Sequence, residues 1–354
     1  MVDVLSASGF GNFDYASLAA KLIEVSQARH QTNVERISTP YDNKIGRLER
    51  ERDKWLGLSD DLSDVKSTLH DTIGRVKAIL DRIDQLQLTV NKAAANESEL
   101  TGYASTFDSL LKGLRRTAEN AFGETNLLGS EETTFSYEVD FNYTTQSVKG
   151  YNLGTGFEIT DSDGKVWVPN FDTGIITRYD DYPDEGAGTS AQIGTGFTVD
   201  SIDGTDITFT IGAETASPTT YTGTLEPTGL GILGSWAYGD LNSEEGRTDA
   251  LDALEDAKAV VKLELTRYEV ALSLVDFYEV RAFDRSRENR AEINDLIIDK
   301  ARAVQEAQQL FEAQTQLTIN RVSNGYAQKN YYAKFFAPFL NSNSEPTTVF
   351  DILI

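Results

Sequence analysis

Apolar residues recur at alternating spacings of three and four along the first third of the chain. The seam consists of Leu62, Val65, Leu69, Thr72, Val76, Ile79, Ile83, Leu86 and Val90. This spacing is typical of the a and d positions of helices that pack in a bundle or coiled coil. The polar stretch 91–98 interrupts it, and a second apolar seam over 100–121 predicts a helix that returns antiparallel to the first. Upstream, residues 17–36 predict a further helix, which Pro40 should interrupt.

The last third of the chain repeats this pattern. Its seam consists of Leu251, Leu254, Val261, Leu265, Tyr268, Leu272, Val275 and Ala282. An apolar stripe continues from Ile293 to Leu317. Helices with such seams need partners, and the seams of the first third are the obvious ones.

The middle of the chain has a different pattern. Glycine, threonine and aspartate become frequent, and short alternating runs such as 135–139 and 207–211 predict β-strands. Residues 153–164 and 193–204 are similar to each other, and each copy ends in an Asp-Gly turn signal. We expect two similar β-units here.

These patterns predict an α+β protein. A long helical rod, built as a coiled coil or bundle from 1–128 and 247–340, should carry an inserted antiparallel β-rich domain over 129–246, followed by a tail over 341–354. The formal net charge is −24, and residues 151–250 hold 17 Asp and Glu against 3 Lys and Arg. The insert therefore carries more than half of the excess charge, as a solvated outer domain would.

Composition excludes several kinds of chemistry. A strongly acidic chain is unsuited to binding nucleic acid. It has no cysteine and only two histidines, His30 and His70, so we expect neither a metal or catalytic centre nor a cofactor. The segment 161–164 looks like the start of a calcium loop but lacks the closing Glu, so a β-turn is the better interpretation, and calcium binding by the Asp-Gly loops is left open. No apolar run is long enough to span a membrane, and residues 1–10 lack the pattern of a cleaved signal peptide.

Four segments resemble bacterial flagellins and related flagellar axial proteins. Residues 81–100 resemble the first long helix of the family and the polar break after it, and Thr117–Gly129 resembles its exit from the helical part. Ala250–Val260 resembles the start of the returning helix, and Arg290–Lys300 resembles the segment that leads into the innermost C-terminal helix. The opening residues 1–36 depart from flagellins and are nearer in style to the filament-cap protein.

The resemblance implies a structural subunit and not an enzyme. Such a subunit would be exported without a cleaved signal peptide to the extracellular flagellum. It would polymerise with copies of itself and meet an export chaperone and other flagellar axial proteins. A filament subunit is the first hypothesis, and a hook–filament junction or cap protein is the related option. The rival hypothesis is a secreted binding module or carbohydrate-active enzyme with a coiled-coil stalk, whose cleft would hold Trp167, Tyr179, Tyr182 or Trp236.

Two groups of side chains are the candidates for subunit assembly. The first group lies on the seams and the second on an aromatic segment near the C-terminus. They are Leu62, Leu69, Val76, Ile83, Leu265 and Leu272, and then Tyr331, Tyr332, Phe335, Phe336 and Phe339. A freely exposed aromatic cluster would be an aggregation hazard in a monomer, so we expect assembly to bury the second group.

Overall fold

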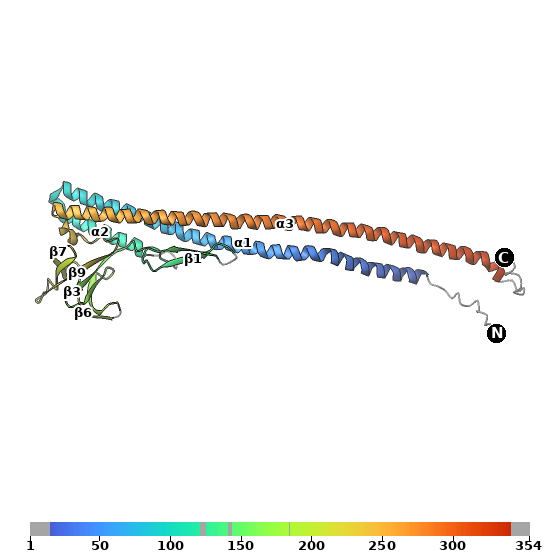
Figure 1. Cartoon of the computed structure of the whole chain (residues 1–354), viewed down its shortest axis with the longest axis horizontal. Coiled ribbons are helices and arrows are strands. Elements are labelled where there is room, and N and C mark those ends of the chain that lie inside the picture. The colour runs from blue at the N-terminus through green and yellow to red at the C-terminus, as the bar shows by residue number, and fades with distance from the viewer. Residues whose placement is uncertain (1–14, 121–124, 141–143, 184, 341–354) are drawn as a thin grey trace. The chain divides into compact units, whose positions relative to one another are not determined.

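The computed structural model describes residues 15–120, 125–140, 144–183 and 185–340. Three helices and an antiparallel sheet inserted between them confirm the predicted α+β class (Figure 1). The helices are α1 (Tyr15–Ala95), α2 (Leu100–Glu119) and α3 (Glu244–Leu340), with the 3₁₀ helices η2 (Glu97–Glu99) and η3 (Ser235–Leu241). The chain divides into two compact units, one with residues 1–53 and 285–354 and the other with residues 54–284. The predicted tail, 341–354, lies outside the described residues.

Helix α1 does not end at Pro40, so the predicted interruption is wrong. The helix runs for 81 residues with Pro40 inside it. Proline removes one backbone hydrogen bond, which leaves the carbonyl four residues earlier without its helical donor. Pro40 is exposed, and water can solvate that carbonyl. The loss of one backbone hydrogen bond is therefore too little to end this helix of 81 residues.

The predicted polar break between the first two helices is narrower than 91–98. Helix α1 continues to Ala95, and η2 then leads directly into α2. The Ser98 hydroxyl donates to the Asn96 side-chain oxygen at 2.7 Å. Arg75 contacts the backbone of Thr117, so α2 returns antiparallel along α1, as predicted.

One apolar core joins α1, α2 and α3 in the 54–284 unit. It contains the α1 seam from Leu58 to Ala93 together with Phe107 and Leu114 of α2 and Val261 of α3. Tyr268 of α3 is also fully buried, and its hydroxyl donates to the Leu127 carbonyl at 2.9 Å. Burying each large side chain contributes roughly 1.5–3 kcal/mol, so this seam dominates the stability of the unit.

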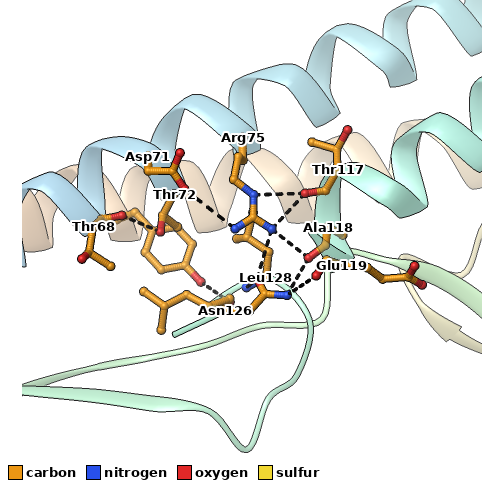
Figure 2. Close-up of polar contacts among 11 residues, drawn as sticks. Thr68, Asp71, Thr72, Arg75, Thr117, Ala118, Glu119, Asn126 and Leu128 are labelled. Carbon is orange, nitrogen blue, oxygen red and sulfur yellow. Dashed lines mark hydrogen bonds and ion pairs between the residues drawn. The ribbon is translucent and has the colours of Figure 1, made fainter. Parts of the chain in front are cut away.

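Arg75 caps the C-terminus of α2 from the neighbouring helix. Its guanidinium donates to the carbonyls of Thr117 and Ala118 at 2.9 Å each and to the Asn126 side-chain oxygen at 3.1 Å (Figure 2). The Asn126 amide donates to the carbonyls of Ala118 and Glu119. The last carbonyls of a helix have no partner within it and carry its partial negative charge. Arg75 and Asn126 supply the missing donors.

The strands form two sheets between α2 and α3. In chain order they are β1 (Thr134–Glu138), β2 (Thr145–Lys149), β3 (Thr155–Asp161), β4 (Val166–Asn170), β5 (Ile175–Asp181), β6 (Glu185–Gln192), β7 (Phe197–Asp203), β8 (Asp206–Ile211) and β9 (Thr219–Gly229). Strands β1 and β2 pair with each other, and the other seven form an antiparallel sheet in the order β6-β5-β4-β3-β9-β8-β7. Tyr137, Val139 and Val148, which lie on or beside β1 and β2, belong to the helical core. The first hairpin of the insert therefore packs on the helices.

The two copies of the sequence repeat occupy matching positions in their hairpins, although β3 is the central strand of the seven-stranded sheet and β7 is an edge strand. Each copy contains the first strand of a hairpin, β3 before β4 and β7 before β8. Gly164 and Gly204 end the copies with φ of +76° and +64°, a conformation that glycine adopts without strain. Phe157 and Phe197 are equivalent in the repeat, and their rings stack at 6.2 Å in the core of the sheet.

The unit with residues 1–53 and 285–354 holds the other portions of α1 and α3. His30 stacks on Phe311 at 4.3 Å between ring centres, and its Nε2 lies 2.8 Å from the Gln308 side-chain oxygen. Lys300 pairs with Asp42 at 2.6 Å. The two portions thus contact each other mainly through partly exposed polar and aromatic side chains, and many apolar ones stay exposed.

Replacing Arg75 should destabilise the 54–284 unit. In Arg75→Met the carbonyls of Thr117 and Ala118 lose their charged donor, which we expect to cost about 2 kcal/mol in the free energy of unfolding by urea. Lys77→Met is the matched control, because the exposed Lys77–Glu269 ion pair at 3.2 Å should contribute less than about 0.5 kcal/mol. Equal losses in the two variants would contradict the capping role.

Candidate assembly surface

The seam residues predicted to join subunits lie inside the chain's own core. Leu62, Leu69, Val76 and Ile83 are at most 1% exposed. Leu265 and Leu272 are partly buried and pack against the same core. Because α2 and α3 cover the α1 seam, these positions pack within the 54–284 unit, and their predicted contribution to contacts between subunits stays a prediction.

The aromatic segment near the end of α3 is exposed. Tyr331, Tyr332 and Phe335 are 66%, 58% and 56% exposed, and the rings of Tyr331 and Tyr332 contact each other edge to face. The side chains of Phe336 and Phe339 lie outside the part of the chain that the structure describes. The three described aromatics thus present exposed ring surface.

A second apolar stripe runs along the exposed face of α3 in the 54–284 unit. Leu263, Val270 and Phe277 are 67%, 64% and 59% exposed, with Leu274 and Val280 beside them at 36% and 59%. Sequence analysis missed these five residues, which we call the outer stripe. A single exposed leucine is ordinary, but five exposed apolar side chains that recur along one side of a helix mark a candidate contact surface.

The outer stripe lies opposite the buried seam of α3. Val261, Tyr268, Val275 and Ala282 are 0% exposed and recur every seven residues. Leu263, Val270 and Phe277 keep the same spacing two positions later, which is about 200° around the helix. The signal was therefore present in the sequence as a second heptad series, offset by two from the first.

Ion pairs occupy the boundary between the buried seam and the outer stripe. Asp276 binds Lys66 of α1 at 2.7 Å, and Glu269 binds Lys77. Glu264, which is 5% exposed, pairs with Arg267 at 2.5 Å, and burial raises the pKa of its carboxyl. The charged groups beside the stripe thus bind within the chain, and its centre stays apolar.

Trp167 and Trp236, two of the residues predicted for the cleft of the rival hypothesis, lie in different surroundings. Trp167 is 0% exposed, and its indole donates to the buried Asp161 carboxylate, which Arg178 also binds at 2.7 Å. Burial opposes ionisation of Asp161, but these hydrogen bonds outweigh it and lower the pKa. Trp167 is thus a core residue of the sheet, whereas Trp236 lines a cavity that is described below.

The described residues show neither a metal-binding cluster nor a membrane-spanning helix. They contain no group of three or more His, Asp or Glu side chains placed to hold a metal ion. Their helices include none that is long and apolar enough to cross a membrane.

Comparison with known proteins yields distant structural similarities. No protein-family model matches the sequence, and a search of curated proteins returned no match. Among solved structures, the flagellar hook-associated protein 3 of Legionella pneumophila is 10% identical, with a TM-score of 0.32 over 75% of this chain and 99% of that one. FlgL of Xanthomonas campestris is 13% identical, with a TM-score of 0.19 over 80% and 99% of the two chains. At these scores neither similarity carries an argument about this chain.

Substitutions on the two faces of α3 should lower the free energy of unfolding of the monomer by very different amounts. Val275→Ser places a hydroxyl in a fully buried site and should cost about 3 kcal/mol in the free energy of unfolding. Phe277→Ser, two residues further on, should cost less than about 1 kcal/mol because the ring is already solvated. Urea unfolding of dilute protein measures both, and a large loss in Phe277→Ser would mean that the outer stripe is covered by the chain itself.

Proposed function

We propose that this protein is a structural subunit of a flagellar axial assembly, which polymerises outside the cell into a flagellin-like filament. One observation carries the proposal: α3 is apolar on two opposite faces, and only one of them is buried in the chain. The arrangement of two long helical segments around a β-rich insert supports it, as does the resemblance of 81–100, 117–129, 250–260 and 290–300 to flagellins. The role is structural and involves no catalysis.

The outer stripe is the proposed contact between copies of the chain. Burying an exposed phenylalanine or leucine contributes roughly 2–3 kcal/mol, so several together are sufficient to drive association. If the stripe of one copy binds a different face of the next, the contact is heterologous, and it propagates as a helical filament when the rotation between copies does not close into a ring. The acidic insert would face solvent and keep the assembly soluble.

The proposed setting follows that of flagellar axial proteins. The chain would pass through the export channel unfolded, without a cleaved signal peptide, with an export chaperone covering its apolar faces beforehand. It would fold at the growing tip and contact other axial proteins at the ends of its own assembly. A junction or cap protein would use the same surfaces in a short assembly, so the length of the polymer distinguishes these options from a filament subunit.

A charge in the outer stripe should prevent association. Phe277→Glu places a carboxylate in an interface that would desolvate it, so we expect sedimentation velocity at rising concentration to show only monomer. Thr248→Glu adds the same charge to α3 at an exposed position outside the stripe and should assemble like the unchanged protein. Negative-stain images of the same samples report polymer length. Normal assembly of Phe277→Glu would refute the proposed contact.

The aromatic segment makes a separate contribution to assembly. Replacing Tyr331, Tyr332 and Phe335 together by serine should abolish polymers and leave the thermal unfolding of the monomer within a few degrees of the original, since all three are exposed. Replacing the exposed residues Gln309, Gln314 and Gln316 by serine is the control for triple substitution on α3. Loss of the cooperative melt in the aromatic variant would assign these rings to the subunit's own core instead.

A further inference from the structure

A cavity of about 720 Å³ lies between α2, η3 and the seven-stranded sheet, within the 54–284 unit. Its volume is within the range of small-molecule binding sites. Lys112 and Arg115 of α2, Phe157 of β3, Phe197 of β7 and Trp236 of η3 all contribute to its wall. The cavity is distinct from the outer stripe, and an inference drawn from it does not depend on the proposed assembly.

Arg115 is buried in the cavity wall with unused hydrogen-bond donors. The residue is only 7% exposed. Its Nε donates to the Thr155 carbonyl at 2.6 Å, and the guanidinium carbon lies 3.1 Å from the centre of the Phe171 ring. Among the described residues its two terminal nitrogens form no hydrogen bond, and Glu119 and Asp172 act on the guanidinium electrostatically without a direct ion pair. Burial lowers its pKa to about 10, so the side chain remains a cation at neutral pH.

Glu119 and Asp172 offset part of the Arg115 charge, but neither binds its terminal nitrogens, and a carboxylate is the best geometric match for those donors. Carboxylate oxygens accept two parallel hydrogen bonds from the terminal nitrogens of one arginine. Lys112 is exposed on the same face of α2, one turn from Arg115, and adds a second positive charge at the rim. This end of the cavity is therefore suited to an anionic group.

The other end of the cavity presents hydrogen-bond acceptors. Asp108 lies two turns before Arg115 on α2, about 10 Å along the helix axis. Its carboxylate accepts from the Ser235 backbone N–H at 2.7 Å and lies 2.9 Å from the Ser235 hydroxyl, which is also 3.2 Å from Asp240. One hydroxyl proton cannot serve both carboxylates, so an acceptor remains for a hydroxyl group of a ligand.

Trp236 supplies a flat apolar surface between the two ends. It is half-buried, and its ring meets those of Phe157 and Phe197 edge to face at 5.2 and 6.0 Å. These contacts fix the indole without covering it completely. A pyranose ring presents C–H groups on one face, which pack on such a surface, and hydroxyls around its rim.

We propose that this cavity binds an acidic saccharide, a sugar chain of about two rings that carries a carboxylate. Arg115 and Lys112 bind the carboxylate, Asp108 and Asp240 accept from ring hydroxyls, and a sugar ring packs on Trp236. Two carboxylates in the wall disfavour a ligand that concentrates two negative charges on one group, such as a phosphate monoester. A neutral sugar would leave the Arg115 donors unpaired.

Isothermal titration of the whole chain with digalacturonic acid tests the proposal. Galactobiose is the neutral probe, and inorganic phosphate is the anion without a sugar. We expect saturable binding of digalacturonic acid, with galactobiose and phosphate each at least about tenfold weaker, the loss that one charged hydrogen-bonded contact carries. Absence of saturable binding, or equal binding of either other probe, would overturn the proposal.

Variants on α2 assign the binding to the cavity. Arg115→Gln should weaken the binding of digalacturonic acid about tenfold or more, and Lys112→Ala should weaken it severalfold. Arg116→Gln is the matched control, because Arg116 is the exposed neighbour and does not line the cavity. Arg115 also binds Thr155, so thermal unfolding is measured in parallel, and the exposed Lys112 provides the test if Arg115→Gln fails to fold. Unchanged affinity in Lys112→Ala, together with unchanged affinity in any folded Arg115 variant, would refute the assignment.

Discussion

The α1 seam between Leu58 and Ala93 can be buried only when α2 and α3 both pack against the same core. Its residues are nearly inaccessible to solvent, and the cluster that covers them includes Phe107 of α2 and Val261 of α3. Helix α2 follows α1 directly, but α3 begins about 150 residues after α1 ends. Two segments that are distant in the sequence therefore share one core, and neither can bury its seam alone. A subunit with this property completes its core only after nearly all of the chain is present.

That constraint also explains why α3 has an unused apolar face. A helix in a small bundle can bury one stripe against its partners, and α3 uses the stripe through Val261, Tyr268 and Val275. The stripe through Leu263 and Phe277 points about 200° away and has no partner within the unit. Ion pairs such as Lys66–Asp276 fix the rotation of α3 against α1, since rotating the helix to bury the outer stripe would break them.

The sequence predicted the fold class because that depends on local periodicity. Spacings of three and four, followed by alternating short runs, distinguished helices from strands without any knowledge of tertiary contacts. Two features could not be predicted in this way. Whether Pro40 ends a helix depends on the solvation of one carbonyl, and which stripe of α3 is buried depends on the partner that the helix meets. Both heptad series are visible in the sequence, but only the packing of α3 against its partners decides which of them is buried.

Side-chain contacts between distant segments were equally hidden. Arg75 is separated by about 42 residues from the carbonyls it caps, and Asp108 by 127 residues from Ser235. Asp108 attaches η3 to α2, and the hydrogen bond from Arg115 to Thr155 attaches β3 of the sheet to α2. The cavity lies at that attachment, so a ligand held by Arg115 would contact the helix and the sheet at once. A ligand that binds only this folded arrangement stabilises it by mass action. Occupancy of the cavity and firm placement of the sheet on α2 are then thermodynamically coupled, and each favours the other.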